Sequence, residues 1–372
     1  MDSWERRVKQ IKAGFFQTAE DAQRYHRNIY ENQGIIRVKN VIEVEHVVNH
    51  AVGSVVDVGT GTGRFAIPMH DAGCKVTGVD VAEPMLEVAR KAAGGRSIDW
   101  VLGDVEALPF DDKSFDTVAS LNVIIHLPQW REAVREFQRV VKDDGRIIFD
   151  MYSGDHVEIA NRHGIKYGTR AQNNHDAAFF SEVRVAEMCS FIESCGMTVD
   201  AIIPHDLLNS NHLIQDRLGA GFEDYCKYIK SELITNDDAF NFWLFVERNV
   251  IPRLPTEATL EYIVVAINGQ GGRNQLPKPL SSYSRPFAAQ GFLRELLAQD
   301  YERIRSIATD LLSQGSVRFM HELSRRLFRH LDPNINLSSL FPEQAEMINK
   351  LASPFAFANQ YFGFLTNLFS RP

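Results

Sequence analysis

The sequence predicts an α/β protein with a doubly wound, mostly parallel sheet of seven strands, a helical insertion and a C-terminal helical lobe. Three observations predict this fold. Short apolar runs alternate with helical patterns from residue 54 onward, a glycine-rich turn joins the first run to its helix, and an acidic residue lies at the end of each of the first three runs. Such alternation is typical of parallel strands joined by crossover helices that cover both faces of the sheet.

The length and composition predict a folded protein of more than one part. The chain has 372 residues, of which 44% are hydrophobic and 24% are charged. Because domains usually hold roughly 100–200 residues, this length predicts two domains, or one domain with an appended lobe. We expect a helical segment over residues 1–40, a main domain over 41–270 and the helical lobe over 285–372.

Charge and cysteine usage exclude several classes of protein. The net charge of −8 argues against a nucleic-acid partner, since phosphate binding depends on Lys and Arg. No stretch approaches the roughly 18 apolar residues of a membrane span, and the N-terminus is charged where a signal peptide is apolar, which predicts a cytoplasmic protein. The four cysteines form no C-x-x-C pair, so we predict neither a metal site nor a disulfide framework.

The elements of the predicted fold follow one another in order. Residues 1–34 read as helical and a second helix covers 36–53, before the first strand. The predicted strands lie at residues 54–59, 75–81, 98–104, 115–123, 146–152, 197–205 and 259–269, with helices at 64–73, 84–94, 130–145 and 184–196. A mostly helical insertion, residues 207–257, separates the last two strands, and a linker rich in Gly, Pro and Ser precedes the lobe.

The most informative motif is the loop VVDVGTGTGRF after the first strand. A strand that runs through closely spaced glycines into a helix brings backbone close to a ligand and points helix N–H groups at it. Gly59, Gly61 and Gly63 give G-x-G-x-G, and Arg64 stands where a dinucleotide fingerprint has its third glycine, which disfavours a pyrophosphate. Asp57, two residues before the loop, suits a ligand with an ammonium group.

Two further acids lie at the ends of the next two strands. Asp80 ends the second strand, where its carboxylate oxygens suit the two hydroxyls of a ribose, a feature that fits a nicotinamide enzyme equally well. Asp104 follows the third strand, where it suits the amino group of an adenine. Acids at three successive strand ends are a more specific signal of a cofactor site than the glycines alone. Helix capping by Asp80 and Asp104 is the competing interpretation.

With these motifs the chain resembles the class I S-adenosylmethionine-dependent methyltransferases, which have a Rossmann-like fold, and more narrowly the branch related to the quinone-biosynthesis C-methyltransferases. The segments VDVGTGTGRF, VTGVDVAEPMLEVAR, GDVEALPFDDKSFDTVAS and VVKDDGRIIF resemble four family motifs in order. The similarity runs from about residue 34 to 152, weakens through 205 and returns near 259–269. VVKDDG departs from the usual Pro-Gly, away from the cofactor.

The resemblance implies S-adenosylmethionine as cofactor and assigns residues to it. Asp57 and the loop from Gly59 to Gly63 would hold the methionine part, and Asp80 the ribose. The full set that we predict to bind the cofactor is Asp57, Gly59, Thr60, Gly61, Gly63, Asp80, Val81, Met85, Asp104, Val105, Leu121, Asn122, Tyr30 and Arg37. Met85 would pack on the adenine.

The roles of three residues, His126, Tyr30 and Arg37, stay open in the sequence. His126 lies where the family often has a histidine facing the substrate and is the candidate general base, with a structural role as the alternative. Tyr30 and Arg37 precede the first strand at a distance where relatives place residues near the cofactor carboxylate. A helix with ordinary surface side chains explains Tyr30 and Arg37 as well.

These observations predict methyl transfer to a small-molecule metabolite, such as a quinone precursor, a sugar or a natural-product intermediate. Residues 120–124 read SLNVI, not the N/D-P-P-Y run of enzymes that methylate amino groups of DNA and of protein glutamine. Whether the acceptor atom is O, N or C stays open, and the helical lobe would permit a homodimer. A non-catalytic scaffold that binds the cofactor and a nicotinamide-dependent oxidoreductase are the alternatives, the second disfavoured by Arg64 and Asp104.

Overall fold

The computed structural model describes residues 3–30, 35–162, 179–206, 240, 244, 247–248, 251–253 and 256–269. The chain forms two compact units. The first comprises Met1–Asn32, Lys39–Leu207 and Pro252–Leu280, and the second comprises Gln33–Val38, Leu208–Ile251 and Ser281–Pro372. The fold and site below belong to the first unit. Within the described ranges, no helix has both the length and the apolar character to cross a membrane.

The N-terminal segment is divided into separate helices, α1 (Ser3–Gly14) and α2 (Ala19–Tyr30), and α3 (Ile35–His50) follows. The expectation of one helical pattern up to residue 34 was therefore wrong at residues 15–18. The break has a local cause: the hydroxyl of Thr18 accepts a hydrogen bond from the backbone N–H of Asp21 at 3.1 Å, which caps the start of α2.

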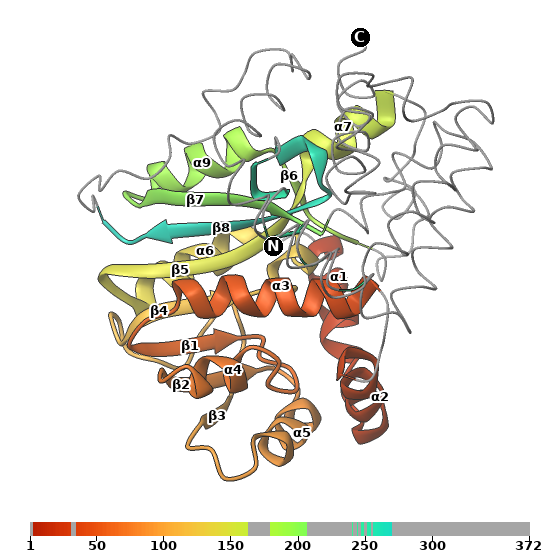
Figure 1. Ribbon diagram of the computed structural model, residues 1–372, viewed down its shortest axis with the longest axis vertical. Helices are drawn as coiled ribbons and strands as arrows, with labels where there is room; N and C mark the ends of the chain where they lie inside the picture. Colours follow the sequence, from red (N-terminus) through yellow and green to blue (C-terminus); the bar gives the residue numbers. More distant parts are fainter. Residues whose placement is uncertain are drawn as a thin grey trace, which may run out of the picture. The chain divides into compact units, whose positions relative to one another are not determined.

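A single sheet forms the centre of the unit (Figure 1). Its strands are β1 (Ser54–Val58), β2 (Lys75–Asp80), β3 (Asp99–Leu102), β4 (Phe115–Ser120), β5 (Val141–Ser153), β6 (Glu182–Val183), β7 (Thr198–His205) and β8 (Glu261–Ile267). The order along the sheet is β3-β2-β1-β4-β5-β8-β7, and the two-residue β6 pairs with β5 off this path. Only the pairs that involve β8 are antiparallel. The predicted doubly wound, mostly parallel, seven-stranded sheet is thus confirmed, with β6 as a short addition.

The helices between the strands follow the predicted pattern. They are α4 (Ala66–Asp71), α5 (Glu83–Ala93), the 3-10 turn η1 (Ile124–His126), α6 (Trp130–Val140), α7 (Gly154–Arg162) and α9 (Val185–Ser194), followed by the short turns η4 (Ile251–Arg253) and η5 (Thr256–Ala258). β5 begins at Val141, five residues before the predicted start. The pairing with β4 shifts between Phe115 and Thr117, which accommodates the turn around Asp144 (φ 60°).

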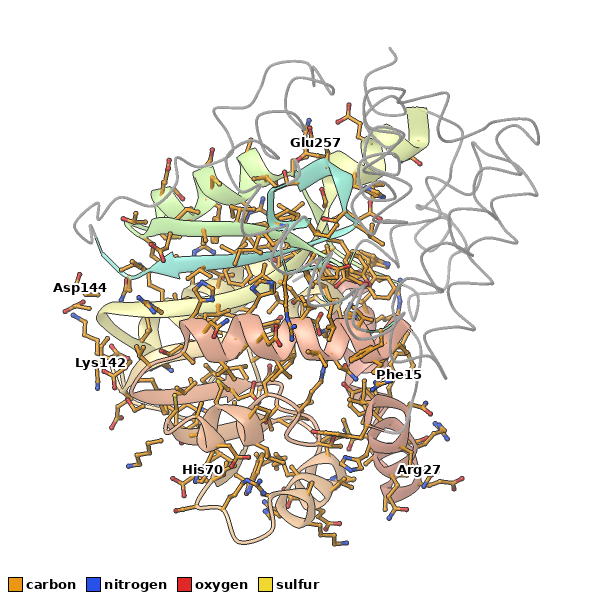
Figure 2. All side chains as sticks on the ribbon, viewed as in Figure 1. Phe15, Arg27, His70, Lys142, Asp144 and Glu257 are labelled. Carbon is orange, nitrogen blue, oxygen red and sulfur yellow. The ribbon has the colours of Figure 1, made fainter. Side chains whose placement is uncertain are left out.

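Side chains that alternate along the strands form one core on each face of the sheet. Val56 of β1 and Phe149 of β5 pack with Phe137 of α6 on one face. Val55 and Ile148, one residue away on each strand, pack with α3 and α4 on the other. Figure 2 shows side chains filling the space between the helices and the sheet, with Arg27 and Asp144 at the outside. Burial on both faces explains why the strands are nearly continuous apolar runs.

The predicted domain borders remain predictions. Most of the insertion at 207–257 and all of the lobe at 285–372, with its proposed dimer surface, lie outside the described residues. Helix α3 runs through the predicted border at residue 40 without a break.

Candidate functional site

The glycine loop has the backbone that the sequence predicts. Gly59, Gly61 and Gly63 all have positive φ, at 71°, 56° and 85°. The N–H groups of Gly59 and Thr60 donate to the carbonyl of Val79 at 2.8 and 3.0 Å, which holds the loop against the end of β2. A Cβ on Gly59 would lie 2.3 Å from a methyl group of Val123, so glycine is required there.

Asp57 lies beneath this loop and is only 1% exposed. One carboxylate oxygen accepts a hydrogen bond from the hydroxyl of Thr60 at 2.6 Å. Loss of hydration raises the pKa of Asp57 to about 7, because burial disfavours the charged form. A buried carboxylate of this kind gains from a cationic ligand, which supports the predicted contact with an ammonium group.

Asp80 is partly buried, and its two oxygens accept hydrogen bonds from backbone N–H groups. Oδ2 accepts from Gly61 and Oδ1 accepts from Ala82, both at 2.9 Å. Burial raises the pKa of Asp80 against the effect of these hydrogen bonds. The carboxylate therefore connects the glycine loop to the start of α5 and keeps further acceptor positions for a ribose. Val81 beside it is 49% exposed.

The third acid follows β3. Asp104 Oδ1 accepts from the N–H of Glu106 at 3.0 Å, and Asp104 forms an isolated bridge with Ala107. The N–H of Gly103 donates to the carbonyl of Asp80 at 2.9 Å. Because β1, β2 and β3 are neighbours in the sheet, the three predicted acids lie in a row along its carboxyl edge.

A small apolar cluster borders the loop. Met85 of α5 is 4% exposed and packs with Ala22 and Tyr25 of α2. A Cβ on Gly61 would lie 3.3 Å from Met85 Cε and 3.8 Å from Tyr25 Cε1, so the glycine leaves room between loop and cluster. Tyr25 lies beside the loop, whereas Tyr30 is 48% exposed and packs on His26. The spacing in the sequence could not distinguish these two tyrosines.

Arg37 belongs to the second unit, where its guanidinium lies 3.8 Å from the centre of the Phe240 ring. Its predicted role at the cofactor, like that of Tyr30, remains a prediction.

The end of β4 turns sharply at the predicted pair Leu121 and Asn122. Leu121 is buried, and Asn122 has a φ of 60°. The N–H of Asn122 donates to both oxygens of Asp150 at 2.8 and 2.9 Å, and its side-chain amide donates to Glu43 at 3.1 Å. Buried carboxylates of β5 and α3 therefore hold this turn.

His126 ends the turn η1, close to two aromatic rings. Its ring centre lies 4.9 Å from that of Phe180, which lies 5.1 Å from that of Tyr152. Since Tyr152 is near the end of β5, the histidine lies beside the half of the carboxyl edge formed by β4 and β5.

Sequence reasoning missed a buried charge cluster, which we define as Lys39, Glu43, Arg64, Asp150, His205, Asp206 and Glu261. Arg64 forms an ion pair with Glu43, and Lys39 Nζ lies 2.6 Å from Glu261 and 3.4 Å from Asp206. These residues come from α3, the glycine loop, β5 and the adjacent ends of β7 and β8. Only the repeated polar side chains on α3 and the strand-end pair His205 and Asp206 hint at them in the sequence.

The residues present fit the predicted cofactor. The positive φ angles and the space at Gly61 leave room for a ligand, and three carboxylates line one edge. Among the described residues, the buried hydroxyl of Thr62 in the loop has no hydrogen-bond partner. Such an orphaned group is expected where a ligand or water completes the site.

Comparison with known proteins agrees with this geometry. Residues 56–149 match the family model described as a methyltransferase domain. Together with the sheet order and the glycine loop, this match identifies a methyltransferase domain over residues 56–149.

The chain is similar to named members of the quinone-biosynthesis branch. It is 37% identical over 98 residues to the ubiquinone/menaquinone biosynthesis C-methyltransferase UbiE of Desulfotalea psychrophila, covering 26% of this chain and 40% of that protein. It is 36% identical over 117 residues to the ubiquinone biosynthesis O-methyltransferase of Idiomarina loihiensis, covering 30% and 48%. The chain thus spans about half the length of the curated relatives that it matches.

Among solved structures, magnesium protoporphyrin IX methyltransferase of Synechocystis, with bound SAH, is 17% identical to this chain with a TM-score of 0.45. The similarity covers 70% of this chain and 100% of that chain.

Proposed function

We propose that the protein binds S-adenosylmethionine and transfers its methyl group to a small-molecule metabolite by in-line displacement. The observation that carries this proposal is the row of Asp57, Asp80 and Asp104 on three neighbouring strands around a glycine loop without room for side chains. When bound, the cofactor supplies a methyl group activated by a positively charged sulfur. The tasks of the chain are to hold both reactants in line and to exclude water.

The described residues divide these tasks. Asp57 would pair with the ammonium group of the methionine part, Asp80 would accept from the ribose hydroxyls and Asp104 would accept from the adenine amino group. Met85, with its neighbours on α2, offers an apolar surface to the adenine ring.

The acceptor is proposed to be a quinone precursor, in line with the names of the two relatives, or else a sugar or natural-product intermediate. The aromatic side chains beside His126 offer a flat apolar surface that suits a ring. For an oxygen or carbon acceptor, His126 is the proposed general base.

The cofactor assignment is tested at Asp80. Asp80→Ala removes the carboxylate at the end of β2, and a hydrogen bond to a charged group is worth about 1.5–3 kcal/mol, or roughly ten- to a hundredfold in affinity. We expect calorimetry to show that loss for both S-adenosylmethionine and S-adenosylhomocysteine. Asp143→Asn, at a side chain 73% exposed, is the control and should bind normally. Equal affinity in Asp80→Ala and wild type would contradict the assignment.

The role of His126 is tested by comparing binding with turnover. His126→Ala should leave cofactor affinity unchanged and lower the rate by about 10²–10⁴, the usual contribution of a general base. Turnover of a metabolite mixture by the wild type would also separate an enzyme from a scaffold that only binds the cofactor. A wild-type rate in His126→Ala would assign a structural role to the histidine.

A further inference from the structure

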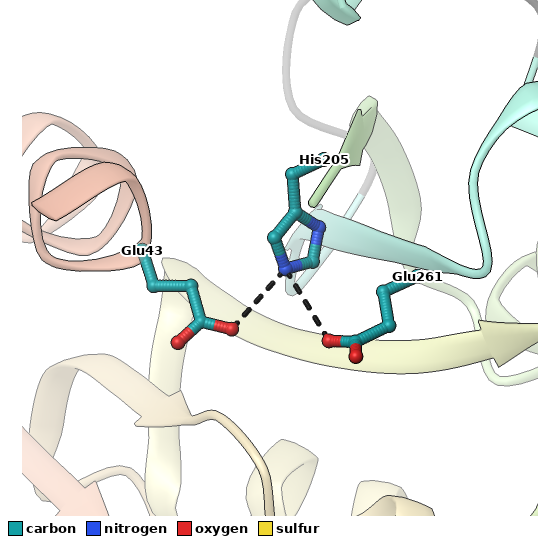
Figure 3. Close-up of side chains that lie close together, drawn as sticks. All are labelled: Glu43, His205 and Glu261. Atoms are coloured by element: carbon teal, nitrogen blue, oxygen red, sulfur yellow. Dashed lines mark hydrogen bonds and ion pairs between the residues drawn. The ribbon is translucent and has the colours of Figure 1, made fainter. Parts of the chain in front are cut away.

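Three side chains of the buried charge cluster have the geometry of metal ligands. His205 Nε2 lies 3.2 Å from Glu43 Oε1 and 3.6 Å from Glu261 Oε2, and the three ligand atoms all lie within 4.8 Å of one another (Figure 3). Ligands about 2.1 Å from a tetrahedral cation are roughly 3.4 Å apart, so the two distances from His205 Nε2 are close to those of such a centre. The exposed fractions of Glu43, His205 and Glu261 are 0%, 1% and 3%.

The fold places these side chains together. His205 is the last residue of β7 and pairs directly with Glu261, the first residue of β8. Glu43 extends toward them from α3, as Figure 3 shows. One imidazole nitrogen and two carboxylate oxygens are a donor set that borderline transition cations accept.

Carboxylic acids outnumber permanent cations in the buried charge cluster. The described residues of the cluster include four carboxylic acids, on Glu43, Asp150, Asp206 and Glu261, but two permanent cations, Lys39 and Arg64. With all four acids ionised and His205 neutral, as metal ligation requires, the described residues of the cluster carry a net charge of −2. Burial of uncompensated charge is costly in free energy, and one divalent cation would neutralise the excess negative charge of the cluster.

We propose that Glu43, His205 and Glu261 bind a divalent transition cation, such as Zn²⁺ or Mn²⁺. Lys39 now bonds both oxygens of Glu261, at 2.7 and 2.6 Å, so it must move aside. Asp206, 3.4 Å from Lys39 Nζ, offers the ammonium a second partner. Three protein ligands leave coordination positions open.

The open coordination positions would allow the cation to bind an oxygen atom of the acceptor. Glu43 also binds the side chain of Asn122 at the end of β4, so the cluster adjoins the edge formed by β4 and β5. An acceptor with a hydroxyl, enolate or carboxylate oxygen could complete the coordination. This step rests on the proposed function, whereas the metal site does not.

The test uses the full chain, stripped of metal, and equilibrium dialysis against Zn²⁺. We expect one equivalent to bind, His205→Gln to weaken binding at least about tenfold, and Lys39→Met to bind as tightly as wild type or more tightly, because a competing ammonium is lost. His70→Gln, at a histidine outside the cluster, is the control and should match the wild type. Thermal unfolding of each variant checks its fold.

A second measurement needs no variant. Electron paramagnetic resonance of the Mn²⁺-loaded wild type should show coupling to the nitrogen of one imidazole. The proposal is overturned if the wild type binds neither cation while Lys39→Met does, since Lys39 would then be the resident cation. It is also overturned if His205→Gln binds Zn²⁺ like wild type. Cofactor affinity is measured separately, on wild type and Asp80→Ala. Failure of the metal proposal can therefore be distinguished from failure of the proposed function.

Discussion

Asp57 is the residue whose environment and proposed role are most closely connected. Burial raises its pKa to about 7, with the Thr60 hydroxyl opposing the shift. In the free protein the acid form is therefore favoured below about pH 7, and the stability that this raised pKa contributes at low pH is lost as pH rises from the ordinary value of 3.8 to about 7. An ammonium group in the site reverses this preference, because it stabilises the carboxylate.

Cofactor affinity should consequently depend on pH through Asp57. Affinity for S-adenosylhomocysteine should rise with pH up to about 7, by as much as tenfold per unit if one proton is lost on binding, and then level off. Calorimetric titration with S-adenosylhomocysteine at a series of pH values measures this dependence.

The variant Asp57→Asn tests whether Asp57 is the group responsible for this pH dependence. Asp57→Asn cannot ionise, so its affinity should be weaker and nearly flat over the same range, while Asp143→Asn should keep the wild-type profile. A slope that persists in Asp57→Asn would assign the pH dependence to another group, such as Asp150, whose pKa burial also raises to about 7.

At the scale of elements, the strand ends were the most predictable feature. The alternation of apolar runs predicts strands, and parallel neighbours bring their carboxyl ends to one edge, so the three acids could be placed from sequence alone. The hydrogen-bond partners of these acids could not be predicted from the sequence. The N–H groups of Gly61 and Ala82 that bind Asp80 follow from how tightly the loop turns.

Element boundaries were less predictable, for local reasons. The break between α1 and α2 depends on the cap by Thr18, a signal present in the sequence as T-x-x-D but outweighed by the helical spacing around it. The early start of β5 depends on an irregular register with β4. Apolar periodicity carries no information on such a register shift.

The buried charge cluster could not be predicted from one sequence. Glu43 and His205 are 162 positions apart, and their contact exists only because α3 packs across the sheet beside β7 and β8. Ionisable residues are usually exposed, so a helix pattern assigns Lys39 and Glu43 to solvent. Burial of both is a property of the tertiary structure.

At the scale of the whole molecule, the strand order divides the carboxyl edge into two halves. The chain reverses its direction of strand addition between β1 and β4, which is where open α/β sheets bind ligands. The three acids lie on the β1–β3 half, while His126 and the cluster residues Asp150, His205 and Glu261 lie toward β4, β5, β7 and β8. Under the proposed function, the cofactor would bind on the β1–β3 half, and the acceptor would bind next to it, toward β4 and β5.

This arrangement predicts how ligands stabilise the molecule. A ligand that binds only the folded state stabilises it by about 2.7 kcal/mol at a hundred times its Kd, and for domains of 150–250 residues each kcal/mol shifts Tm by roughly 2–4 °C. S-adenosylhomocysteine should therefore raise Tm by roughly 5–10 °C in thermal unfolding followed by fluorescence. NADH at the same concentration should leave Tm unchanged, because Arg64 and Asp104 disfavour a dinucleotide, and Asp80→Ala should respond to S-adenosylhomocysteine far less than wild type. A rise in Tm with NADH but not with S-adenosylhomocysteine would instead identify a nicotinamide-dependent enzyme.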